Sequence, residues 1–101
     1  MTVTDDNRLT LTATLAERND LRYTPAGLPA IDCTLHHRSV QPEAGGERKV
    51  DCELLAVAFG DVARKLSAVP KGATLRCVGF LARRYRTGTA VALHITGFEI
   101  A

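Results

Sequence analysis

Residues 48–72, RKVDCELLAVAFGDVARKLSAVPKG, contain the pattern that decides the fold. The first half alternates between apolar and charged residues, which is typical of a half-buried β-strand. One face of this strand holds Val50, Cys52, Leu54 and Ala56, and the pattern turns apolar on both faces toward Phe59. After Gly60 the period changes, because Val62, Leu66 and Val69 recur at helical spacing. We therefore expect a strand followed directly by a short helix, with Asp61 capping the helix.

Four further strands are expected around this unit. Residues 7–16 and 30–39 alternate before it, and strand-like patterns at 73–86 and 89–100 follow it. Pro and Gly residues break the chain at 25–29 and 42–46, and Thr87-Gly88 marks a hairpin tip. Three strands, a helix and two strands is the order of an OB-fold, an all-β five-stranded Greek-key barrel with a short helix between strands 3 and 4. We expect residues 1–101 to form one such domain rather than an SH3-like barrel, which usually lacks that helix.

Length and composition restrict the class of protein. A chain of 101 residues can bury a single modest core. It has no apolar run near the ~20 residues that a membrane span needs, and no signal-peptide pattern at its start, so we expect a cytoplasmic protein. The three cysteines are odd in number and form no C-x-x-C pair, which argues against a disulfide framework or a zinc site. We expect Cys33, Cys52 and Cys77 each to be a small buried hydrophobe.

No motif indicates an enzyme or a cofactor. The sequence contains no phosphate-binding glycine loop, no dinucleotide fingerprint, no zinc-protease helix motif and no nucleophile elbow. His36 and His37 are adjacent in an expected strand, so they point to opposite faces and cannot chelate one metal ion. We expect packing roles for His37 and His94, and no catalysis.

Charge is distributed unevenly along the chain. Residues 1–59 hold six Lys or Arg against nine Asp or Glu, whereas residues 60–101 hold seven against two. Arginine outnumbers lysine ten to three, and arginine both forks onto phosphates and stacks on bases. This bias is compatible with a nucleic-acid partner, and it is also what a GC-rich genome produces.

The most informative short stretch is Arg83-Arg84-Tyr85-Arg86, at the expected hairpin tip. Proteins that bind single strands combine cations that follow the backbone with flat rings on which bases stack. The alternative is a solvated basic edge that discourages pairing between sheets.

Several longer stretches resemble one protein family. These are NRLTLTATL at 7–15, TPAGLPAIDCTLHHRSVQPEAGGER at 24–48, VGFLARRYRTG at 78–88 and ALHITGFEI at 92–100. They are similar to primosomal replication protein N (PriB), a dimeric relative of bacterial single-stranded DNA-binding protein. The sequence ends at the last strand, without the long polar tail of the wider group, which favours PriB. The resemblance implies an accessory protein of replication restart that binds single-stranded DNA, docks on the PriA helicase and helps to recruit DnaT.

The resemblance also implies which residues bind DNA. Arg22 and Arg38 match positions of basic contacts in the family, and Tyr23 repeats the pairing of cation and ring, although it could equally pack over the barrel end. Arg48 and Lys49 lie near the strand 2–3 loop, which helps to form the family's DNA surface. With Arg83, Arg84, Tyr85 and Arg86 they make up the expected site.

The sequence departs from the family pattern near that loop. Some members carry a tryptophan where this chain has Asp51, and an aspartate there would repel phosphate rather than stack a base. A lysine that follows the hairpin in those members has no match here. We therefore expect the DNA surface to shift toward the hairpin at 83–88.

Two other functions remain open. The protein could be a protein-docking adaptor with weak DNA binding, in which the basic hairpin meets an acidic protein surface. It could also be an RNA-binding OB module, although such modules usually cluster aromatic residues on strands 2 and 3. A homodimer is expected from the family alone.

Overall fold

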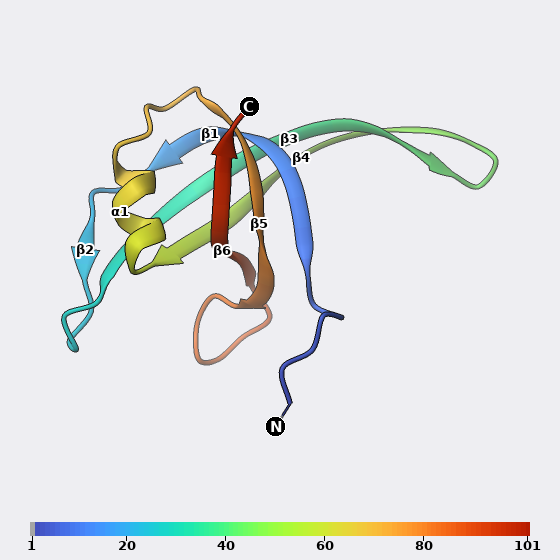
Figure 1. Ribbon diagram of the computed structural model, residues 1–101. Helices are drawn as coiled ribbons and strands as arrows, with labels where there is room; N and C mark the ends of the chain where they lie inside the picture. Colours follow the sequence, from blue (N-terminus) through green and yellow to red (C-terminus); the bar gives the residue numbers. More distant parts are fainter. Residues whose placement is uncertain (1) are drawn as a thin grey trace.

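The computed structural model describes residues 2–101 and consists of a closed barrel of strands with one short helix (Figure 1). The elements, in chain order, are β1 (Leu9–Arg18), β2 (Arg22–Tyr23), β3 (Pro29–Glu43), β4 (Gly46–Phe59), α1 (Asp61–Ser67), β5 (Thr74–Arg83) and β6 (Val91–Ile100). The expected OB barrel is confirmed, with α1 between its third and fourth long strands. The two-residue β2 is an addition to it, formed in the first loop by pairing with β3.

The barrel closes because β1 pairs on both of its edges. Its first half runs antiparallel to β5, with Leu9 opposite Gly79, and its second half pairs with β3, with Thr14 opposite His36. An irregularity between Leu15 and Glu17 bends the strand at the point where it turns toward β3. A short parallel pairing of β4 with β6 completes the circuit.

Alternating apolar residues fill the interior of the barrel. Those with fully buried side chains include Leu15, Ile31, Leu35, Leu75 and Leu93, and α1 adds Leu66 at one end. Each such side chain stabilises the fold by about 1.5–3 kcal/mol through its removal from water. Cys33 and Cys77 lie in this core as expected, and burial raises their pKa values to about 12 and about 11.

The start of α1 differs from the expectation. Gly60 is the N-cap residue, with φ 71° and ψ −141°, and no side chain bonds the helix start. Asp61 lies inside the first turn, where its carboxylate accepts a hydrogen bond from Arg64 at 3.0 Å. The prediction that Asp61 caps the helix is therefore wrong by one residue, because the positive φ of the true cap suits a glycine.

The far half of the β3–β4 hairpin leaves the barrel and projects as an arm (Figure 1). The two strands pair without a break from Ala30–Phe59 to Glu43–Gly46. Residues 40–49, which form most of the arm, are exposed on both faces. Cys52 lies where the ladder leaves the barrel and is exposed, so the prediction that it is buried is wrong.

Gly79 marks a close approach between β5 and β6. A Cβ atom at this position would lie 1.9 Å from the backbone oxygen of His94. The register of the two strands shifts between Val78 and Gly79, and only a residue without a side chain fits there.

Within residues 2–101, no helix is long and apolar enough to cross a membrane.

Candidate nucleic-acid interface

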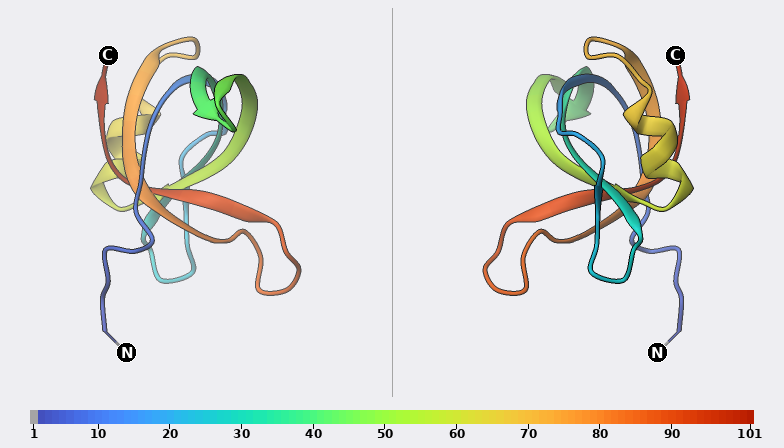
Figure 2. Two further views of the ribbon diagram at one scale, coloured as in Figure 1. Left: turned by 90° about the vertical axis from the view of Figure 1, so that its right-hand side faces the viewer. Right: turned by 90° about the vertical axis from the view of Figure 1, so that its left-hand side faces the viewer.

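Two loops border one face of β3 and β4 at the same end of the barrel. One loop, residues 19–28, joins β1 to β3 and contains β2, and the other, residues 84–90, joins β5 to β6. Figure 2 shows both loops extending from that end. A backbone hydrogen bond of 2.8 Å from Arg84 to Ala90 closes the second loop.

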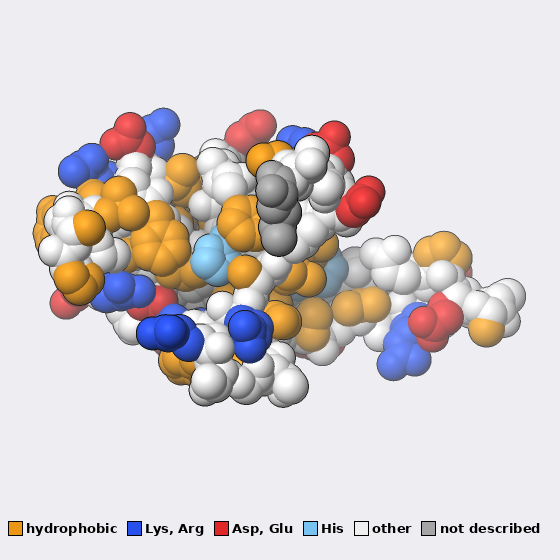
Figure 3. All heavy atoms as spheres, turned by 90° about the horizontal axis from the view of Figure 1, so that it is seen from below, with side chains coloured by type: hydrophobic (Ala, Val, Ile, Leu, Met, Phe, Trp, Pro, Cys, Tyr) orange, Lys and Arg blue, Asp and Glu red, His pale blue; other side chains and the backbone are white. Residues whose placement is uncertain are grey.

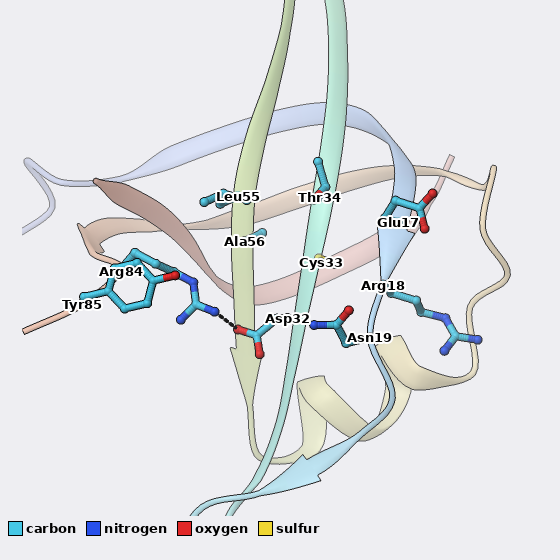
Figure 4. A pocket seen from close by; sticks show the side chains of 10 residues that line it. All are labelled: Glu17, Arg18, Asn19, Asp32, Cys33, Thr34, Leu55, Ala56, Arg84 and Tyr85. Atoms are coloured by element: carbon cyan, nitrogen blue, oxygen red, sulfur yellow. Dashed lines mark ion pairs between the residues drawn. The ribbon is translucent and has the colours of Figure 1, made fainter. Parts of the chain in front are cut away.

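The carboxylate of Asp32 connects the two loops. The Nε of Arg22 donates to its Oδ2 at 2.9 Å. The Nη2 of Arg84 lies 2.9 Å from its Oδ1, and Figure 4 shows this second pair. The Asp32 side chain is only 15% exposed, so both pairs are partly shielded from water. Alternation placed Asp32 on the outer face correctly, but the pairing of two distant arginines with it was not predicted.

Tyr85 lies beside this group. Tyr85 is 62% exposed. The Arg84 guanidinium lies 5.1 Å from the centroid of the Tyr85 ring, within the range of a cation–π contact. Arg84, Tyr85, Asp32, Thr34 and Leu55 are among the residues that line a shallow pocket over β3 and β4 (Figure 4). Tyr23 is equally exposed, so the alternative that it packs over the barrel end is not what the structure shows.

The remaining expected cations fall into two groups. Arg83 and Arg86 lie in or beside the loop at 84–90, are exposed, and form no ion pair within the described part of the chain. Arg38, Arg48 and Lys49 lie on the hairpin, toward or within the arm, apart from the loops. The structure therefore brings together Arg22, Asp32, Arg84 and Tyr85, and it separates them from the arm.

Acids pair with the cations of the arm as well. Arg48 lies 3.2 Å from Glu43, and Arg38 lies 3.3 Å from Asp51. Asp51 is also 2.6 Å from His36 Nε2, and this hydrogen bond, followed by the charge of Arg38, holds its pKa below the usual range. Asp51 thus remains a charged group.

The two adjacent histidines have separate partners, as their alternation predicts. His37 contacts the Thr12 backbone oxygen at 2.7 Å and the Ser39 hydroxyl at 2.8 Å, so both of its ring nitrogens have partners. No group of three potential metal ligands occurs among residues 2–101.

An aromatic row was missed in the sequence. Phe80 stacks on His94 with centroids 5.0 Å apart, and Phe59 lies 6.0 Å from the same imidazole. Figure 3 shows hydrophobic side chains gathered around a histidine, with Lys or Arg side chains along the border of the patch. Burial, and then the charge of Arg84, lowers the pKa of His94. The signal was present, but grouping these rings requires the pairing of β5, β6 and β4.

The fold, with two loops flanking the β3–β4 face, is that of the single-strand-binding class of OB barrels. A family model described as another single-strand binding protein family matches residues 7–97. Wild-type single-stranded DNA-binding protein from Thermus aquaticus has a similar structure, with a TM-score of 0.75 and 26% identity over 94% of this chain and 50% of that one.

A narrower likeness identifies the family. Replication restart protein PriB of Bordetella pertussis is 42% identical over 88% of this chain and 83% of its own length. The structure of PriB from Ralstonia solanacearum at 2.3 Å resolution has a TM-score of 0.86 and 42% identity, and covers 94% of this chain and 98% of that one. The chain belongs to the PriB family of replication restart proteins.

Proposed function

We propose that this protein binds single-stranded DNA in the cytoplasm as a non-enzymatic component of replication restart. The observation that carries the proposal is the hairpin at 83–86. It presents Arg83 and Arg86, which form no ion pair among residues 2–101, beside Arg84 and the exposed ring of Tyr85. Guanidinium groups follow the phosphate backbone, and a base stacks on Tyr85 with a contribution of about 1–3 kcal/mol. Membership of the PriB family supports this role.

The site extends from the hairpin over the β3–β4 face. Arg22, Tyr23 and Arg38 continue it, and Arg48 and Lys49 in the arm contribute less, because the arm's ion pairs oppose phosphate binding. Homodimerisation, docking on the PriA helicase and recruitment of DnaT are the further parts of the proposal. They follow from the family resemblance, and light scattering and co-purification with each protein test them.

The test is a titration of the protein into a labelled thymine oligomer and a matched duplex at two salt concentrations, followed by fluorescence anisotropy. We expect preference for the single strand and a log–log salt slope of about −2 to −4, with about 0.7 for each phosphate neutralised. The variant R83A/R84A/R86A is expected to lose most of the affinity. The control R64A/K65A/K71A removes the same charge from α1 and the following loop and is expected to bind nearly normally. Equal losses in both variants would reject the proposed site.

A protein-docking adaptor with weak DNA binding is the second candidate. One observation favours it: Arg22, Arg38, Arg48 and Arg84 all pair with carboxylates of the chain itself. Absence of oligomer binding at low salt, together with helicase binding in the absence of DNA, would favour the adaptor. Tighter binding to a ribose oligomer would favour an RNA-binding module.

A further inference from the structure

Asp32 holds two arginines from different loops on one carboxylate. Its neighbours Ile31 and Cys33 point into the core, so its own side chain lies on the outer face of β3. Arg22 comes from β2 and Arg84 from the loop at 84–90, and each lies 2.9 Å from a different carboxylate oxygen. We propose that Asp32 is a positioning residue that fixes Arg22 and Arg84 as a two-arginine clamp for one stretch of sugar-phosphate backbone. This inference rests on the proposed function.

Burial shows that the group is built into the fold. The side chains of Asp32 and Arg84 are 15% and 25% exposed, and that of Arg22 is 46% exposed. Oδ1 of Asp32 is fully buried and accepts no hydrogen bond from the described residues, so Arg84, 2.9 Å away, neutralises it through an ion pair. A carboxylate this shielded is costly without its partners, so Asp32 restrains both side chains and, through them, both loops.

The arginines keep donors for a ligand while they are held. A guanidinium carries five N–H groups. Arg22 donates one, from Nε, to Asp32, whereas Arg84 approaches Asp32 through Nη2 as an ion pair. The remaining N–H groups are available to phosphate oxygens, and the group of three carries a net charge of +1. Arg84 also contacts the Tyr85 ring, so fixing Arg84 places the ring on which a base stacks.

The clamp predicts an effect opposite to simple electrostatics. Removal of an acid from a DNA-binding surface ordinarily tightens binding, because repulsion is lost. Here the acid orders two long side chains before the ligand arrives. Without it, the two side chains lose their conformational entropy when the ligand binds, and this cost weakens binding. The variant D32N keeps the shape of the side chain and removes its charge, so it separates the two effects.

The experiment measures binding of D32N to the labelled thymine oligomer across salt concentrations. We expect affinity to fall about five- to tenfold, although the net charge rises by one. We also expect the magnitude of the salt slope to fall by up to about 1.4, because two phosphate contacts are lost at about 0.7 each. Tighter binding with a steeper slope would overturn the proposal and make Asp32 a competitor of phosphate.

Two further comparisons show whether Asp32 acts through the arginines. In R22A/R84A, the further change D32N is expected to tighten binding by no more than about threefold, the scale of one screened charge. A loss in that background equal to the loss in the parent would overturn the clamp. The variant D32E retains the charge and is expected to recover most of the affinity. Urea unfolding identifies any variant that has simply lost its fold, and D32E then carries the test.

A direct reading of the arginines separates this inference from the proposed function. The Arg22 Nε–H group donates to Asp32, so its NMR signal is expected to be ordered in the parent chain and to become mobile in D32N. If the parent binds no oligomer, the proposed function fails, and the phosphate clamp fails with it. If the parent binds and the Arg22 signal does not change in D32N, the clamp alone is wrong.

Discussion

The two halves of the β3–β4 ladder consist of the same two strands in one continuous register, yet they place charge in opposite settings. In the barrel half, core residues cover one side of the ladder, and Asp32 is 15% exposed with two arginines on it. In the arm half, Asp51 is 62% exposed and binds Arg38 and His36. Similar groups therefore do different work: the shielded carboxylate fixes its partners, whereas the exposed one is screened by water and salt.

The largest expected effect tests how far the barrel depends on close packing that the arm lacks. G79A places a methyl group against the β6 backbone, and we expect it to lower the free energy of unfolding by about 3 kcal/mol or more. G46A, in the arm, meets no atom nearer than 3.9 Å and is expected to change it by less than about 0.5 kcal/mol. Urea unfolding measures both. A stable G79A protein would show that the β5–β6 contact can relax.

A second comparison concerns the cations of the two regions. R83A/R86A removes the unpaired arginines near the loop end and leaves Asp32 with both partners. We expect affinity for a thymine oligomer to fall about tenfold at low salt, with the slope reduced by about 1.4. R48A/K49A in the arm removes the same charge and is expected to cost about threefold or less, because Glu43 already offsets Arg48. The reverse order would place the DNA surface on the arm.

The two acids give a third comparison. D51N removes an exposed negative charge, and no buried side chain depends on that charge for its position. We therefore expect binding to the oligomer to tighten by about threefold, the scale of one screened charge near phosphate. D61N on α1 is the control for net charge and is expected to change little. Weaker binding by D51N would mean that Asp51, like Asp32, positions its arginine.

The smallest effect is a pH dependence of the barrel end. His94 has a lowered pKa in the folded chain, so the unfolded chain takes up its proton first as the pH falls. The contribution of neutral His94 to the free energy of unfolding is fully present above the unfolded-state pKa of about 6.5. It is lost as the pH falls toward the lower pKa of His94 in the folded chain. H94F is expected to lose less stability than the parent between pH 7.5 and pH 5.5. Identical pH profiles would contradict this assignment.

The sequence predicted the fold well where the periodicity reflects burial. Strand alternation and the period change after Gly60 located the long strands and α1, because inward residues must be apolar in a barrel of this size. The prediction that Cys52 is buried was wrong for a related physical reason. Alternation shows which face a residue occupies, and it does not show where the barrel that covers the face ends.

The residues of the candidate site could be proposed from the sequence, but their arrangement in space could not. The basic hairpin at 83–86 was visible in the sequence because charge and ring are adjacent there. Asp32, Arg22 and Arg84 are brought together by the closure of the barrel, so no local pattern connects them. The row of Phe59, Phe80 and His94 likewise depends on strand pairing. Two-residue strand β2 has no period to detect, since it exists through its contact with β3.

The pairing of β1 with both β3 and β5 has a consequence for folding during synthesis. Leu9 pairs with Gly79, so the first half of β1 waits for a partner that is synthesised 70 residues later. At about 5–20 residues per second, that interval is about 4–14 s on the ribosome. During this time β3 and β4 can form their hydrogen-bonded ladder from the two-residue turn. The apolar side chains of β1, in contrast, have no complete barrel in which to be buried. The nascent chain is therefore most vulnerable to aggregation or to chaperone capture at its N-terminal strand.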